Sequence, residues 1–120
     1  MNLFISYSFH PEDKQVYDHF LRILKPLAQK NNIKILTASD PMPMNPIEKV
    51  FPLIEISDIC LIIATKGDFK NKSGLYATSF WIYSELIYAI SKKKIISVFV
   101  ENGVNIGDIP KVKTEIQTFD

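Results

Sequence analysis

The chain has 120 residues, the usual length of one small domain, and its hydrophobic content of 47% with 22% charged residues is typical of a folded globular protein. Its 14 basic and 13 acidic side chains leave a formal charge of +1, without the broad positive field that nucleic-acid binding requires. We therefore expect a single domain, residues 1–120, that does not bind nucleic acid directly.

Potential metal ligands are few. Cys60 is the only cysteine, so an internal disulfide and a thiolate metal site are excluded, and His10 and His19 lack the partners of a metal cluster. No apolar run approaches the roughly 20 residues that span a bilayer, and no basic region precedes an apolar stretch at the N-terminus. We expect no metal, no membrane contact and a cytoplasmic location.

The first part of the chain alternates strand and helix patterns. Residues 3–8 are apolar and aromatic, which predicts a strand, and the sequence Pro-Glu-Asp at 11–13 predicts a helix start. Apolar residues then recur at helical spacing from Val16 onward up to Lys30, with Pro26 in the last turns. A short strand is predicted at residues 33–36.

The second part repeats this alternation. Three prolines in residues 37–46 predict a stiff exposed loop, followed by a helix at 47–56 that Pro52 interrupts. Residues 59–65 form a continuous apolar run, as a central parallel strand does. After a polar loop at 66–75, we expect a helix at 79–90 that ends before three lysines, a strand at 95–100 and a short fifth strand at 116–119.

This order predicts an α/β fold, a flavodoxin-like parallel sheet of four to five strands with helices on both faces. Ligands of such sheets bind at the carboxyl ends of the strands, which brings together the loops after Ser8, Leu36 and Thr65. No helix follows the last strand. We therefore expect either a minimal fold or a domain that lacks its last helix or is fused to a further module.

Glu85 is the side chain that most needs explanation. It is the only charged residue within the otherwise apolar and aromatic residues 79–90, and Trp81 lies one helical turn before it on the same side. A carboxylate in such a helix is costly unless it is paired, hydrogen-bonded or used in chemistry. From the residues alone, a surface Glu85 paired with a lysine and a structural Trp81 remain alternatives.

Several functions of this architecture are excluded directly. A phosphoacceptor receiver domain needs acidic residues after the first strand and an aspartate after the third, where this chain has SFHPED and IIAT. The SFHPED segment also lacks the glycine of a flavin phosphate loop, and no GxGxxG or Walker motif occurs.

The chain resembles a TIR (Toll/interleukin-1 receptor) domain of the bacterial type. The resemblance covers nearly the whole chain in element order, with FISYS at its start and the proline-bearing segment at the place of the family's BB loop. Its most specific part is the pattern Ser-x-Trp-x-x-x-Glu-Leu. The residues that carry the later part of the resemblance are Tyr76, Ser79, Trp81, Glu85 and Leu86.

The resemblance implies cleavage of the nicotinamide–ribose bond of NAD+, with Glu85 as the catalytic carboxylate. A shielded carboxylate stabilises the oxocarbenium character that develops on the ribose, and nicotinamide leaves without a strong acid. Tyr7, Ser8 and Phe9 would then line the nicotinamide or ribose wall and Trp81 the pocket floor. NAD+ would be a substrate rather than a cofactor, giving ADP-ribose or, where water is excluded, cyclic ADP-ribose.

The resemblance also implies activation by self-assembly through TIR–TIR contacts, with the segment around Asp40, Met42 and Met44 at the interface. A sensor module, fused or separate, and a role in bacterial antiviral defence would follow. Two alternatives remain: a TIR scaffold that acts only by homotypic association, and an enzyme similar to nucleoside deoxyribosyltransferases, which also use a carboxylate at a ribose carbon.

Overall fold

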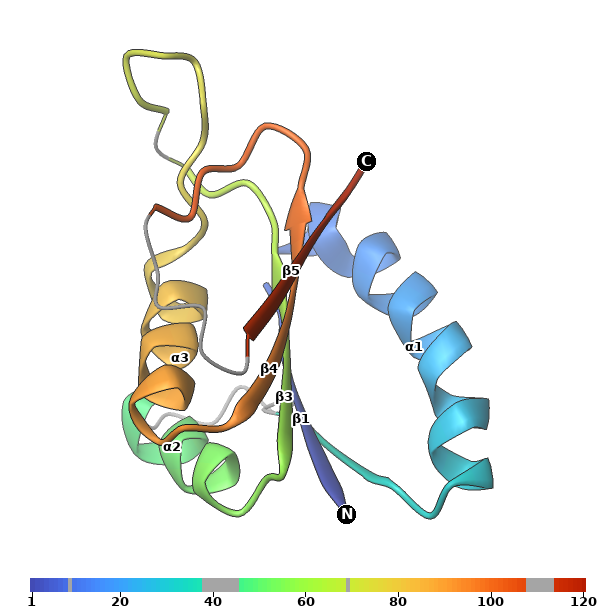
Figure 1. Cartoon of the computed structure of the whole chain (residues 1–120). Helices are drawn as coiled ribbons and strands as arrows, with labels where there is room; N and C mark the ends of the chain where they lie inside the picture. The colour runs from blue at the N-terminus through green and yellow to red at the C-terminus, as the bar shows by residue number, and fades with distance from the viewer. Residues whose placement is uncertain (9, 38–45, 69, 108–113) are drawn as a thin grey trace.

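A computed structural model describes residues 1–8, 10–37, 46–68, 70–107 and 114–120. Strands and helices alternate along these residues, as the sequence predicts (Figure 1). In chain order they are β1 (Asn2–Ser6), η1 (Pro11–Asp13), α1 (Lys14–Lys30), β2 (Lys34–Thr37), α2 (Pro46–Glu55), β3 (Ile59–Ala64), α3 (Phe80–Ser91), β4 (Ile95–Glu101) and β5 (Thr114–Phe119).

The strands form one five-stranded sheet in the order β2-β1-β3-β4-β5, and every pair of neighbouring strands is parallel. This is the flavodoxin-like arrangement that the sequence predicts. The chain moves from β1 to one side of the sheet with β2 and to the other side with β3. The carboxyl ends of β1 and β3 therefore flank the topological switch point, where open α/β sheets bind their ligands.

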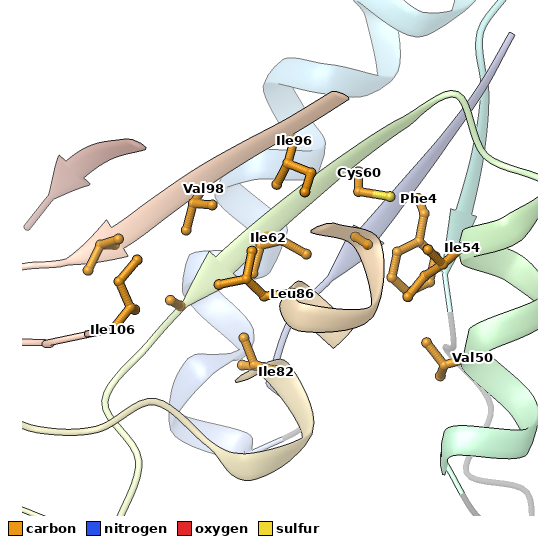
Figure 2. Packing of buried hydrophobic residues seen from close by; sticks show 13 residues of the cluster. Phe4, Val50, Ile54, Cys60, Ile62, Ile82, Leu86, Ile96, Val98 and Ile106 are labelled. Atoms are coloured by element: carbon orange, nitrogen blue, oxygen red, sulfur yellow. The ribbon is translucent and has the colours of Figure 1, made fainter. Parts of the chain in front are cut away.

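Helices cover both faces of the sheet: α1 lies on one side, and α2 and α3 lie on the other (Figure 1). The central strand β3 serves both layers because its side chains alternate between them. Cys60 and Ile62, both fully buried, join the cluster under α2 and α3, together with Phe4, Leu86 and others (Figure 2). Leu61 and Ile63 join the second cluster, under α1.

The structure corrects three details of the predicted elements. Helix α2 continues through Pro52 to Glu55 and is not interrupted there, because Val50 and Ile54 are buried in the core and this packing outweighs the one backbone hydrogen bond that proline removes. Strand β1 ends at Ser6, so residues 7 and 8 lie past its end. Strand β5 begins at Thr114 rather than at 116, since polar residues are tolerated in an edge strand.

Cys60 is buried in β3, and burial raises the pKa of its thiol to about 11, so this group stays protonated at neutral pH. Within the described ranges, no three side chains of the His, Cys, Asp or Glu types gather as a metal site would require. No helix in the same ranges is long and apolar enough to cross a membrane.

Candidate active site

Helix α3 presents Glu85 to a cleft because three apolar residues on the adjoining helix face hold it on the sheet. Ile82, Leu86 and Ala89 are at most 2% exposed and pack on the core. Ser79 caps the helix, since its Oγ accepts a hydrogen bond from the backbone N–H of Ile82 at 3.2 Å. With this start and packing fixed, Glu85 is directed along the helix flank toward the carboxyl end of β1.

Glu85 lines a pocket of about 250 Å³ at this edge of the sheet. Past the end of β1, Tyr7, Ser8 and His10 form one wall, and Trp81 and Ile82 contribute from α3. Among the described residues that line this pocket, Glu85 is the only carboxylate. The structure therefore brings together four residues that the sequence predicted for one site: Tyr7, Ser8, Trp81 and Glu85.

Burial raises the pKa of Glu85 from its ordinary value of 4.5 to about 7. The Ser6 hydroxyl acts in the opposite direction and lowers this pKa through its interaction with the carboxylate. The interaction is weak, because the buried Ser6 Oγ forms no hydrogen bond of standard geometry. A pKa near neutrality is the condition in which a carboxylate can accept or release a proton during a reaction.

Tyr7 is held in place by a second aromatic ring. Its ring stacks on that of Tyr17 from α1, with 3.5 Å between ring centroids and 8° between planes. Burial and the hydrogen bond with Tyr17 raise the pKa of the Tyr7 hydroxyl, so it remains a neutral phenol. Because Tyr17 covers one face of the Tyr7 ring, only the other face and the edge are available to a ligand.

Trp81 is 46% exposed, so it lies at the open rim of the pocket. This corrects the expectation of a floor position. Other side chains of helix α3 are exposed as well, namely Phe80, Tyr83 and Ile87, so this helix is buried on one side only. The inner wall beside Glu85 is instead formed by Ile82, which is 2% exposed.

His10 is a site residue that the sequence did not single out. Its side chain lines the Glu85 pocket and two adjoining hollows, of about 670 and 400 Å³. Its backbone N–H donates to the Oγ of Ser8 at 3.1 Å, which fixes the turn after β1. Its position shortly after a strand end was the only signal in the sequence that could have found it.

Two hollows extend the cleft on either side of Glu85. The larger is lined by the start of α3, by Asp68 and by Ile106, and the smaller by Lys14, Tyr17 and Asp18 from α1. Both share residues with the Glu85 pocket. The carboxyl edge of the sheet therefore offers a continuous surface that is longer than one sugar ring.

Hydrogen bonds from the strand ends hold this edge together. The Thr65 hydroxyl donates to Asp13 Oδ2 at 3.1 Å, and the Lys66 N–H donates to Glu101 Oε1 at 2.9 Å. The Gly67 N–H donates to the carbonyl of Ala77 at 2.7 Å, so the loop after β3 runs directly against the segment before α3. A Cβ at Gly67 would lie 2.9 Å from that carbonyl oxygen, which only glycine avoids.

Four of the predicted site residues lie outside the described residues: Phe9 of the substrate wall and Asp40, Met42 and Met44 of the interface segment. Their roles remain predictions.

The fold and the cleft define a flavodoxin-like α/β protein that places a carboxylate with a raised pKa, Glu85, at the topological switch point. No protein-family model and no curated protein matches the sequence. Solved structures do match. The chain is similar to a 2-deoxyribosyltransferase from Leishmania mexicana, with a TM-score of 0.61 and 17% identity over 82% of this chain and 63% of the transferase. It is also similar to a CMP N-glycosidase from Clostridium botulinum, with a TM-score of 0.64 and 11% identity over 100% of this chain and 90% of the glycosidase.

At these low sequence identities, the likeness to the two structures shows a similar fold alone. The chain spans less than two thirds of the transferase but nearly the full length of the glycosidase. The resemblance to TIR domains rests on the sequence, from FISYS at the start of the chain through the proline-bearing segment to the pattern around Trp81 and Glu85.

Proposed function

We propose that this chain cleaves the N-glycosidic bond between a base and the ribosyl C1′ of a nucleoside or nucleotide, with Glu85 as the catalytic carboxylate. The observation that carries the proposal is Glu85 itself, whose pKa burial raises to about 7 in a cleft at the switch point of the sheet. The two similar structures, a deoxyribosyltransferase and a CMP N-glycosidase, support the same class of reaction.

The chemistry needs little beyond one carboxylate. As the C1′–N bond breaks, its electron pair leaves with the base, and the ionised Glu85 stabilises the positive charge on the sugar or forms an ester to C1′. Water then attacks C1′ and releases the sugar, with its proton passing to the base or to solvent. A second base in place of water would give transfer instead of hydrolysis.

A specific observation favours NAD+ as a second candidate substrate. A neutral base must gain a proton to leave, yet no carboxylate besides Glu85 is among the described residues that line the pocket. Asp68 and Asp18 line only the adjoining hollows. Nicotinamide is bound to ribose as a cation and leaves without protonation, so NAD+ suits a pocket with one carboxylate and a cleft that extends beyond one sugar ring.

The test is base release, followed by chromatography, from a panel of ribonucleosides, deoxynucleosides, nucleoside 5′-monophosphates and NAD+. It is run with wild type, Glu85→Gln and, as a matched control, Glu55→Gln on the neighbouring helix. We expect free base from at least one substrate with wild type and Glu55→Gln, and none with Glu85→Gln. An acceptor base added to the mixture separates transfer from hydrolysis.

Which substrate reacts distinguishes the two candidates. Nicotinamide with ADP-ribose or its cyclic form supports the NAD+ reaction, and cytosine or another base from a monophosphate supports nucleotide cleavage. Equal base release by wild type and Glu85→Gln would overturn the proposed role of Glu85. Absence of release from every substrate by folded wild type would favour the non-enzymatic scaffold.

A further inference from the structure

His10 lies where the three hollows of the cleft meet. The Glu85 pocket shares residues with the larger hollow at the start of α3 and with the smaller hollow beside α1. Among the described residues, His10 is the one that lines all three. A substrate with its C1′ atom at Glu85 extends from there into one hollow or the other. In either orientation, the bond between C1′ and the base crosses the junction that His10 lines.

The backbone of His10 is held on both sides, while its ring is available. Its N–H donates to Ser8 Oγ at 3.1 Å, and its carbonyl oxygen accepts the N–H of Asp13 at 2.9 Å. The Asp13 carboxylate accepts a hydrogen bond from the Thr65 hydroxyl, which ties this turn to the end of β3. Within the described part of the chain, no hydrogen bond occupies the imidazole ring. A fixed backbone with an unoccupied ring is the arrangement of a side chain that meets a ligand.

The other described side chains of this pocket are poorly suited to deliver a proton to a departing base. Tyr7 is engaged with Tyr17, and burial and this hydrogen bond raise the pKa of its hydroxyl. The two serines of the pocket accept backbone hydrogen bonds, and serine hydroxyls do not ionise near neutral pH. Imidazole gains and loses a proton in this range. Because His10 is exposed, it can also recover its proton from solvent.

We propose that His10 is the general acid of the reaction, whose imidazolium gives a proton to the base as the C1′–N bond breaks. The electron pair of that bond and the proton both go to the base, which leaves as a neutral molecule, while Glu85 stabilises the charge on the sugar. Water then attacks C1′ and passes a proton to the neutral imidazole. The products are the free base and a sugar with a hydroxyl at C1′, and His10 is restored.

This role rests on the proposed function, and it concerns the neutral bases of nucleosides and nucleotides, which need a proton to leave. It makes the contribution of His10 depend on the charge of the base. A base methylated on a ring nitrogen carries a positive charge in the nucleoside, so it leaves without a proton, as nicotinamide does. Guanosine with N7-methylguanosine, and cytidine with N3-methylcytidine, are pairs that share one sugar and differ in this charge.

The test compares wild type, His10→Gln and His19→Gln on both members of each pair, as nucleosides and as 5′-monophosphates, by chromatography of the released base. His19 is the matched control, since it is the other histidine of the chain, is exposed on α1 and lines none of the three hollows. We expect His10→Gln to lower kcat for the neutral base about 100-fold or more and for the charged base less than about threefold. His19→Gln should leave both rates within about twofold.

Activity of His10→Gln on the charged base also shows that this variant is folded. An equal fall for both bases, or no fall for the neutral base, would overturn the role of His10 and leave the proposed function in place, provided that Glu85→Gln removes activity on both. A wild type that cleaves only charged bases would overturn it in favour of the NAD+ candidate. No release from any substrate by folded wild type would overturn the proposed function itself and the role of His10 with it.

Discussion

Two glutamates on neighbouring helices, Glu55 on α2 and Glu85 on α3, have opposite properties. Glu55 is at the surface, where the Tyr88 hydroxyl donates to it and Lys92 lies 3.4 Å away, and these hydrogen bonds lower its pKa. Glu85 lines a pocket in which no described residue forms an ion pair with it, and burial raises its pKa to about 7. One residue type thus gives a surface contact in one place and a candidate catalytic group in the other.

The difference lies in the surroundings rather than in the sequence. Both carboxylates belong to amphipathic or apolar helices that pack on the same sheet face. Lysines follow the end of α3 and reach Glu55, while the capped start of α3 and the segment after β1 enclose Glu85. Solvent access and available partners, which a local pattern does not specify, decide the charge state of each.

The largest effect is expected from Glu85→Gln, which keeps the shape of the side chain and removes its charge. Base release or NAD+ loss should fall by roughly 10³-fold or more, since a carboxylate that stabilises the transition state is lost. Glu55→Gln should leave the rate within about twofold, because it lies outside the cleft. Steady-state kinetics of the two variants side by side measure this. A comparable loss in both would mean that the two glutamates do not differ in function.

With a substrate whose base leaves without protonation, as nicotinamide does, the pH dependence of the reaction is expected to follow Glu85. Its ionised form is the active one, so kcat/KM should rise with pH and level off above a midpoint near pH 7. Between pH 6 and pH 8 the increase should be about tenfold. A rate that is flat over this range, for a step shown to be chemical, would contradict a role for the Glu85 carboxylate.

The two glutamates should change the pH dependence of the free energy of unfolding in opposite directions. Burial raises the pKa of Glu85 above 4.5, so the folded chain binds this proton more tightly than the unfolded chain does. The resulting contribution to the free energy of unfolding is fully present below about pH 4.5 and is lost as the pH rises to about 7. Glu85→Gln should therefore be more stable than wild type at pH 8, by on the order of 2 kcal/mol, and no more stable at pH 4.

Urea unfolding at both pH values measures this difference. Glu55→Gln is the control with the opposite sign, since the pKa of Glu55 is lowered and its stabilising contribution is lost on acidification. A Glu85→Gln variant that is less stable than wild type at pH 8 would indicate that the carboxylate is a structural partner rather than a buried charge.

The smallest expected effect is that of Ser6→Ala. The Ser6 hydroxyl opposes the effect of burial on Glu85, so its removal should raise the pKa of the carboxyl further. The midpoint of the pH–rate profile should move to higher pH while the maximal rate changes little. A shift to lower pH would show that the serine does not stabilise the ionised form.

Much of the fold follows from local patterns along the chain. The apolar run of β3, the spacing of α1 and the lysines after α3 predict their elements within one or two residues. The errors fall at Pro52, where packing of Val50 and Ile54 keeps the helix continuous, and at β5, where an edge position accepts polar residues. Both depend on contacts with residues distant in sequence.

The residues of the candidate site were likewise predicted only in part from the sequence. The sequence singles out Glu85, and the strand-end rule brings Tyr7 and Ser8 to it. His10 was missed, and Trp81 was expected deeper than its rim position. A side chain's depth depends on which neighbours cover it, and these come from β1, α1 and α3 together.

By itself, the sequence determined the order of strands and helices, the parallel sheet that this order requires, and the isolation of one carboxylate in an apolar helix, because periodicity and composition act over short distances along the chain. Only the tertiary structure decided that Glu85 faces a cleft with a pKa near 7 while Glu55 faces solvent, and that the opposite side of α3 remains an exposed apolar stripe. Burial and charge pairing are properties of surfaces brought together by folding, so they are fixed by the packing of elements and not by any one of them.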